Sequence, residues 1–365
     1  MKAIWTLIVL AGIAPLAGAQ QVNRVSGIPG ESHRVEDSSV LANGDVALAG
    51  ERYYFSPSFT VLATLSRAQS DGTPLWTLSM QVLGETNTAF GVRELEDTSM
   101  LFGFHFGFQA SSLALARVSS AGIPVWVRSY PGDSTYGAAG MERDRTVAAE
   151  YAVIANRATL PVGVSGQLLR IETFGGNTIF NRAYEPDGIV TTSAHFNDLD
   201  FEIDSGDYYV TGGVTRVIGE NEYENDLLVA RIHRITGATV WCRAYTLPPR
   251  EEAGPRAEEG YSIELDSTGA VHVVARADSP LEEFGRAGAL HLKLDPITGN
   301  VLATSFLPDV EPGLASLDRL SSGNLLASGR RTFGDGQGQA QMWEVSSATA
   351  LSPWRAEYTD GTSSG

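Results

Sequence analysis

The chain has 365 residues, of which 43% are hydrophobic and 39 are Gly, and this composition excludes a disordered polypeptide. A formal net charge of -17 disfavours binding to nucleic acid or to an anionic membrane surface. The single cysteine excludes an internal disulfide, so stability has to come from a packed core.

Residues 1–19 have the features of a cleavable signal peptide. Lys2 supplies a positive charge, an apolar stretch follows, and Ala17-Gly18-Ala19 fits a small-residue cleavage site. The apolar stretch is too short and too interrupted by Pro and Gly for a good membrane-spanning helix, and no later segment is long enough. We therefore expect cleavage after Ala19 and a secreted or periplasmic protein without membrane insertion.

A motif recurs six times in the rest of the chain, at intervals of 50 to 62 residues. In its best copy, "GATVWCRAY", an aromatic residue follows a turn Gly by four positions and a Tyr follows four positions later. The copies begin at Gly72, Gly122, Gly176, Gly237, Gly299 and Ala350. A period of this size is typical of solenoids, propellers or arrays.

Strand patterns precede every copy of this motif. Segments such as "FTVLATLSRA" and "DLLVARIHRI" alternate apolar and polar residues with the period of a half-buried strand. Further upstream, Asn43-Gly44, Ser205-Gly206, Thr268-Gly269 and Ser322-Gly323 have hairpin-turn chemistry. The third repeat, around residues 143–158, lacks this turn and is the weakest copy.

Each repeat therefore holds about four short strands, and amphipathic helices are almost absent. We predict an all-β fold, a β-propeller of six blades of four antiparallel strands, with seven blades left open. The predicted domain spans residues 20–358, and residues 359–365 form a polar tail. Because "QQVNRVSGIPGES" resembles the fourth strand once more, we expect it to complete a blade, with the copy at Trp354–Tyr358 outside the ring or competing for that place.

The repeats "DLLVARIHRITGATVWCRAY" and "GALHLKLDPITGNVLATSF" resemble the SBBP-type β-propeller repeats of bacterial secreted and surface proteins. The same segments are more distantly similar to repeats of PQQ-dependent quinoproteins, where a Thr-Gly turn precedes a docking Trp. Both resemblances imply a propeller. Quinoproteins use more blades, a Ca²⁺ site and often a vicinal disulfide, and one cysteine cannot form that disulfide.

Few residues stand out as candidate sites. Cys242 occupies a strand position filled elsewhere by Thr, Val or Asn, which favours a structural role. The recurring aromatic residues favour packing between blades, and they are Trp76, Trp126, Phe180, Trp241 and Trp354. No pair among the six histidines has tight metal spacing, and nucleophile-elbow, phosphate-loop, dinucleotide and zinc motifs are absent. We therefore predict no catalytic and no cofactor-binding residue.

One stretch has alternating acidic residues that would share a strand face, and these are Asp198, Asp200, Glu202 and Asp204. Carboxylate oxygens at this spacing form a weak Ca²⁺ candidate, and a solvated acidic face is the alternative. The acidic insertions Gly219–Asp226 and Pro248–Tyr261 are the longest loops. Binding residues concentrate on loops above a rigid scaffold, so a ligand face is expected there.

The sequence favours an exported, non-catalytic propeller that binds or scaffolds a protein or glycan at the cell surface or in the periplasm. One alternative is a propeller enzyme, either a quinoprotein-like oxidoreductase or a glycan lyase or hydrolase. Another is a purely structural module of a larger assembly. Nucleic acid is not expected as a partner, and the sequence does not indicate an oligomeric state.

Overall fold

A computed structural model describes residues 32–54, 60–82, 85–107, 111–144, 147, 149–159, 163–186, 191–202, 206–219, 222–246, 258–278, 287–307, 311–332, 338–347 and 354–358. The predicted signal peptide and the polar tail lie outside these residues. The described part of the chain contains no helix that is long and apolar enough to cross a lipid bilayer.

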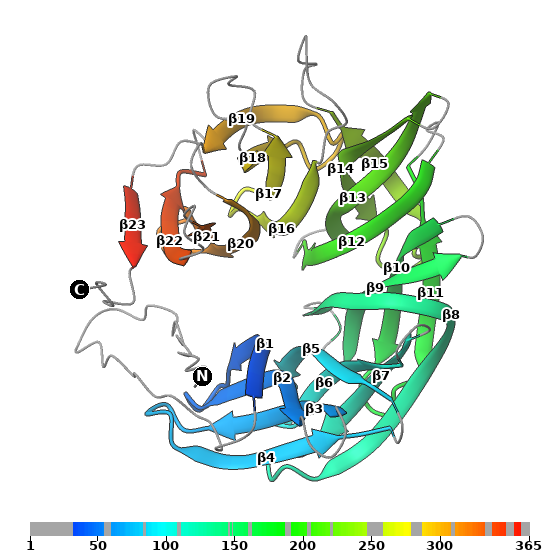
Figure 1. The fold of residues 1–365 in the computed structure, drawn as a ribbon, viewed down its shortest axis with the longest axis vertical. Coiled ribbons are helices and arrows are strands. Elements are labelled where there is room, and N and C mark those ends of the chain that lie inside the picture. Colours follow the sequence, from blue (N-terminus) through cyan, green and yellow to red (C-terminus); the bar gives the residue numbers. More distant parts are fainter. Residues whose placement is uncertain are drawn as a thin grey trace. The chain divides into compact units, whose positions relative to one another are not determined.

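The described strands group into six antiparallel blades of four strands (Figure 1). Blade 1 comprises β1 (Ser32–Val40), β2 (Val46–Tyr54), β3 (Thr60–Ala68) and β4 (Pro74–Met80). Blade 2 comprises β5 (Asn87–Glu94), β6 (Met100–Phe106), β7 (Ser111–Val118) and the start of β8 (Pro124–Arg143). Blade 3 comprises the end of β8, β9 (Glu150–Thr159), β10 (Gly163–Glu172) and β11 (Thr178–Tyr184). Strand β8 thus joins two blades into one seven-stranded sheet.

The other three blades form separate four-stranded sheets. Blade 4 comprises β12 (Thr191–Phe201), β13 (Tyr208–Gly219), β14 (Glu222–Ile232) and β15 (Thr239–Tyr245). Blade 5 comprises β16 (Glu259–Leu265), β17 (Val271–Asp278), β18 (Ala287–Leu294) and β19 (Val301–Leu307). Blade 6 comprises β20 (Glu311–Arg319), β21 (Leu325–Thr332), β22 (Gly338–Val345) and β23 (Trp354–Tyr358).

This architecture confirms the predicted all-β propeller and its four-stranded repeat. One detail differs from the expectation. The copy at Trp354–Tyr358 is strand β23, which pairs with β22 as the fourth strand of blade 6. This sheet therefore does not need the N-terminal segment for its fourth strand, and that segment lies outside the described residues.

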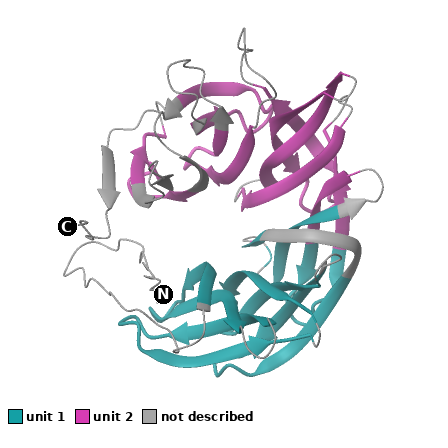
Figure 2. Cartoon of the chain, viewed as in Figure 1, with its two compact units in different colours: residues 1–143, 147–157, 170–179 teal, residues 144–146, 158–169, 180–365 magenta. Residues whose placement is uncertain are grey.

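The core lies between successive sheets. Within each unit, alternating side chains of one blade face the next, so the core clusters draw residues from two neighbouring sheets. Leu65 of blade 1 packs with Met100 and Phe102 of blade 2, whereas Val229 of blade 4 packs with Leu292 of blade 5. The chain divides into two compact units (Figure 2). Unit 1 is residues 1–143, 147–157 and 170–179, and unit 2 is residues 144–146, 158–169 and 180–365.

Candidate functional site

The recurring tryptophans dock onto the following blade. The indole Nε1 of Trp76 donates a hydrogen bond to the carbonyl of Ser120 at 3.0 Å, and Trp126 donates to Thr173 at 3.1 Å. Trp241 donates to Pro296 at 3.1 Å. Each acceptor lies in the turn of the next repeat, so these indoles have the packing role that the repetition predicts. The side chain of Trp354 lies outside the described side chains.

The Tyr four residues later holds the same turn. The hydroxyl of Tyr130 donates to the carbonyl of Gly176 at 2.7 Å, and Tyr184 and Tyr245 donate to Gly237 and Gly299 at 2.8 and 2.6 Å. Burial raises the pKa of Tyr130 to about 12, so its hydroxyl keeps the proton that it donates. The Trp and the Tyr of the Trp-x-x-x-Tyr motif therefore both donate a hydrogen bond to the turn of the next blade, and we call this pair of contacts the clamp.

Cys242 is buried, with 6% of its surface exposed, and its strand neighbour across the sheet is Ala230. This placement agrees with a small buried side chain rather than an accessible thiol.

The acidic row on β12 faces the first strand of blade 5. Asp198 accepts hydrogen bonds from the Ser262 hydroxyl at 2.7 Å and the Ile263 amide at 3.0 Å, and Asp200 accepts from the Leu265 amide at 2.8 Å. Burial raises the pKa of Asp198 to about 7, although these donors counteract the rise. Two of the four calcium candidates, Asp198 and Asp200, thus already accept hydrogen bonds from backbone amides of the next blade. We call such a contact a latch.

The remaining two candidates do not join them. Glu202 lies 3.5 Å from the guanidinium of Arg231, and Asp204 lies outside the described residues. Within those residues, no group of three or more His, Cys, Asp or Glu side chains has the arrangement of a metal site. Calcium binding by the complete row stays a prediction.

The structure brings together one half-exposed polar cluster that the sequence did not reveal. Nε2 of His195 on β12 lies 2.8 Å from Oε1 of Glu259 on β16, with side-chain exposures of 31% and 30%. Asn197 donates to the same carboxylate oxygen and to the Gly260 carbonyl, both at 2.8 Å. The Tyr261 hydroxyl lies 3.4 Å from the other oxygen. We call these four side chains, His195, Asn197, Glu259 and Tyr261, the blade 4–5 cluster.

Local backbone features make room for this cluster. Gly213 lies opposite His195 in the β12–β13 ladder, where a methyl group would come within 2.7 Å of the imidazole. His195 and Asn197 are two positions apart on β12 and both reach Glu259, and the bulge between Phe196 and Asp198 follows them. Burial acts to raise the pKa of Glu259, but the hydrogen bonds from His195 and Asn197 outweigh it and hold the pKa below its usual value. The carboxylate is therefore ionised at neutral pH.

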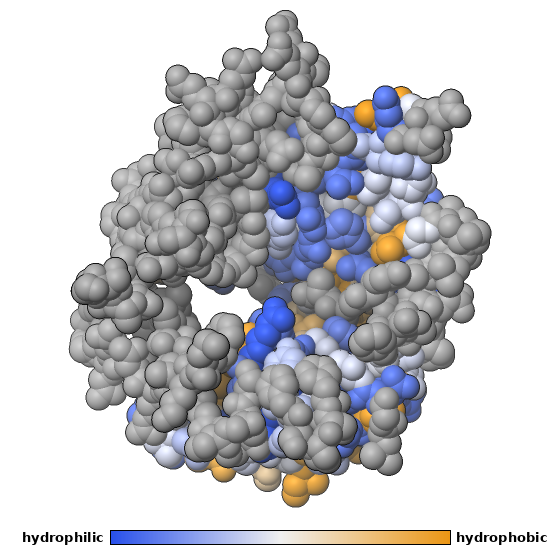
Figure 3. Space-filling view, viewed as in Figure 1, coloured by the Kyte–Doolittle hydropathy of each residue, from blue (hydrophilic) through white to orange (hydrophobic). Residues whose placement is uncertain are grey.

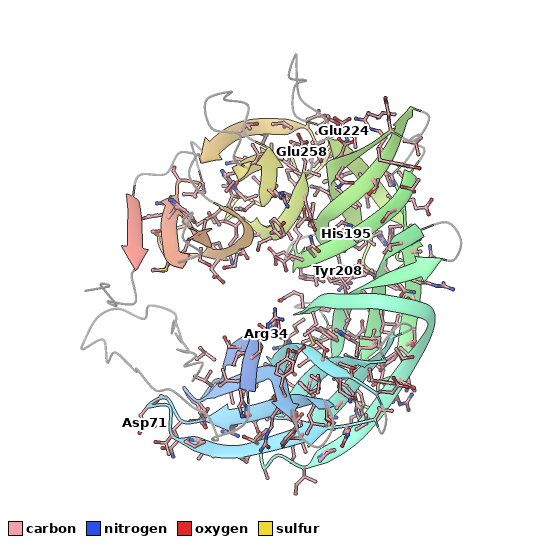
Figure 4. All side chains as sticks on the ribbon, viewed as in Figure 1. Arg34, Asp71, His195, Tyr208, Glu224 and Glu258 are labelled. Carbon is pink, nitrogen blue, oxygen red and sulfur yellow. The ribbon has the colours of Figure 1, made fainter. Side chains whose placement is uncertain are left out.

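The structure corrects the bounds of the two predicted acidic loops. Gly219 ends β13, residues 222–226 belong to β14 and residues 259–261 belong to β16, because polar side chains can occupy the ends of strands; residues 220–221 and 247–257 lie outside the described part of the chain. Arg216 of β13 contacts Asp226 at 2.9 Å and Glu224 at 2.6 Å, and Thr246 donates to Asp226 at 2.9 Å. The Glu258 amide donates to the Asn225 carbonyl at 3.0 Å, which joins β14 to the residue before β16. Figure 4 labels His195, Glu224 and Glu258 at this part of unit 2. Hydrophilic residues cover blade 4 on the face shown in Figure 3.

This arrangement presents a fixed carboxylate, an imidazole, an amide and a phenol to solvent. Glu222 and Glu224 lie at the start of β14 and Glu258 precedes β16, and Arg216 pairs with Glu224 and Asp226. Such a surface can accept hydrogen bonds and attract cationic groups. In unit 2 the described cluster draws side chains from two blades, fewer than the three or more that would favour a propeller enzyme.

The chain has no match among protein-family models or curated proteins. Among solved structures it resembles a europium-containing methanol dehydrogenase, with 11% identity, a TM-score of 0.53 and coverage of 87% of this chain and 68% of that one. The α-L-arabinanase of Penicillium chrysogenum shares 10% identity over 86% and 93% of the two chains, at a TM-score of 0.54. The NanB sialidase of Streptococcus pneumoniae shares 8% identity over 95% and 71%, at 0.53. At these identities the likeness concerns the fold alone, and the fold that these neighbours share with this chain is the β-propeller.

Proposed function

We propose that the protein is an exported β-propeller binding module whose ligand site is the blade 4–5 cluster together with the described acidic residues beside it, which are Glu222, Glu224, Asp226 and Glu258. The observation that supports this most directly is the half-exposed Glu259 carboxylate, which three neighbouring side chains hold in place. A pre-organised charged group at the end of rigid sheets is typical of recognition sites. No covalent chemistry is needed for this role.

The charge of the site indicates the kind of ligand. The described residues at this end include five carboxylates, of which Arg216 neutralises part, and the whole chain carries a net charge of -17. A negative surface speeds association with a positive partner and disfavours an anionic one. Of the two ligand classes that the sequence suggests, a protein segment rich in Lys or Arg fits this charge better than a neutral glycan.

Binding of a ten-residue lysine peptide to the full chain, measured by calorimetry at low salt, tests the proposal. Glu259→Gln should weaken binding by about tenfold, equivalent to about 1.4 kcal/mol. Glu96→Gln is a matched control, because it removes one exposed carboxylate from unit 1. We expect less than a twofold change for the control. Equal losses in the two variants would contradict this site, and binding of neutral oligosaccharides in place of the peptide would favour the glycan alternative.

A further inference from the structure

Blade 5 contains a line of buried polar side chains that the repeat does not require. His272 on β17 and His291 on β18 are both fully buried, with 0% of their surface exposed. Nδ1 of His272 lies 3.0 Å from Nε2 of His291, and the two rings are within 11° of parallel. Nε2 of His272 lies 3.1 Å from Asp266, and Nδ1 of His291 lies 3.4 Å from the Ser305 hydroxyl on β19.

Comparison with blade 4 shows which polar side chains of this line have no polar counterpart at the same position of the repeat. Lys293 is the cross-strand partner of His272, as Arg231 is of Tyr209 in blade 4. His272 contacts Asp266 as Tyr209 contacts Glu202. The place of His291 is taken in blade 4 by the buried Val229. An aliphatic side chain therefore satisfies the fold at this position, and a buried imidazole needs hydrogen bonds that Val does not.

The hydrogen bonds of the line have one consistent direction. The pKa of Asp266 is held at about 2, because hydrogen bonds from Thr268 and His272 outweigh the effect of burial. An ionised Asp266 can only accept, so we assign the His272 proton to Nε2. Nδ1 of His272 must then accept from Nε2 of His291, which leaves Nδ1 of His291 as an acceptor for the Ser305 hydroxyl. Burial lowers the pKa of His272, so the ring is neutral at pH 7 and can play this part.

We propose that Ser305 is a nucleophile for acyl transfer, with His291 as its general base and with His272 and Asp266 as positioning residues. Ser305 is partly exposed and lies on β19, the edge strand of blade 5. The order of groups matches that of a serine-histidine-aspartate triad with a second imidazole inserted. A serine-to-histidine distance of 3.4 Å is within the range of apo sites, which tighten when substrate binds.

The reaction is a transfer from an ester to water. Oγ of Ser305 bonds to the acyl carbon, its proton passes to Nδ1 of His291, and the alcohol leaves with that proton. Water then adds to the acyl-serine and gives a proton to the same nitrogen, and the carboxylic acid departs as Ser305 regains its hydrogen. While Nδ1 of His291 holds the extra proton, its Nε2 proton can shift to His272. The positive charge then lies beside Asp266. Lys293, at 3.3 Å from the same carboxylate oxygen, opposes that shift.

An alkyl fluorophosphonate, which phosphonylates activated serines, tests the proposal on the full chain. We expect one adduct per chain, located at Ser305 by peptide mass spectrometry, and none in Ser305→Ala. His291→Gln should slow labelling by about a hundredfold or more, the usual contribution of a general base. Ser66→Ala is the matched control, because Ser66 lies on a blade strand beside Thr77 rather than His. This variant should be labelled at Ser305 at the wild-type rate.

Two further outcomes keep the test decisive. If His291→Gln fails to fold, as judged by its circular dichroism, the pH profile of wild-type labelling replaces it, and the rate should fall as the base is protonated in acid. A flat profile, an adduct at another residue, or no adduct at Ser305 would each overturn the proposal.

Discussion

Replacing Trp241 by Ala should remove one of the contacts between blades 4 and 5 without changing a charge. The indole is 8% exposed and meets the Tyr209 ring edge-on at 6.1 Å. It also covers Gly299, where a methyl group would lie 3.1 Å from the indole. Truncation of a buried Trp to Ala costs about 3–5 kcal/mol, since packing is lost and a cavity remains. We expect a loss in this range in the free energy of unfolding in urea.

Comparing Trp241→Phe with Trp241→Ala separates the contributions of packing and of hydrogen bonding to the loss in the free energy of unfolding. Phe keeps an aromatic ring over Gly299 but loses the bond to the Pro296 carbonyl. That carbonyl still accepts from Arg231 at 2.9 Å and Tyr209 at 3.2 Å, so no buried acceptor is left unsatisfied. The loss should be about 1–2 kcal/mol. Val240→Ala, at an adjacent position with 48% exposure, should change stability by less than about 0.5 kcal/mol. A Trp241→Ala cost as small as that of Val240→Ala would refute the docking role.

Two other perturbations test the frame of the blades. Gly44→Ala and Gly299→Ala both place a side chain at positive φ, +85° and +70°, but nothing lies within 4 Å of the new methyl at Gly44. Gly44→Ala should lower the free energy of unfolding by about 1 kcal/mol, and Gly299→Ala should lower it by at least about 1 kcal/mol more. Equal losses for the two variants in urea unfolding would contradict the contact between Trp241 and the turn at Gly299. Because the pKa of Asp198 in the folded chain, about 7, exceeds the 3.8 of an unperturbed aspartate, the folded chain holds more protons between these two pH values than the unfolded chain does. The contribution of Asp198 to stability should be present below pH 3.8 and be lost as pH rises through 7. Unfolding at pH 5 and pH 8 should show a smaller difference in Asp198→Asn than in the wild type.

The repeat was readable from the sequence because its signals are local. A turn Gly, a Trp and a Tyr at spacings of four residues indicate one hairpin, and their recurrence gives the number of blades, whereas the alternating segments between the copies give the strands per blade. The docking role of Trp241 followed from recurrence alone, since a residue repeated in register serves contacts that are repeated too.

The blade 4–5 cluster was not readable in the same way. His195 and Glu259 are 64 residues apart, and neither belongs to the motif that revealed the repeat. The signal that would have found them lies in the first strands. Asp198 follows the bulge of β12, and His195 precedes it by three positions. Ser262 follows the bulge of β16, and Glu259 precedes it by three positions. An alignment anchored on this bulge would have placed the pair side by side.

The same alignment explains why site chemistry is hard to derive from a propeller repeat. Asp37 follows the bulge of β1 and accepts the Val92 amide of the next blade at 2.9 Å, as Asp198 accepts that of Ile263. Ser262 accepts the Leu317 amide in the same way, whereas Gly91 and Gly140 follow the bulges of β5 and β8, so this contact recurs at some blade interfaces and is missing where the residue is Gly. Three positions before the latch, blade 1 has Arg34 where blade 4 has His195. Arg34 pairs with Glu36 of its own strand, whereas His195 contacts Glu259 of the next blade, so the repeat fixes where this side chain lies but not which residue it is.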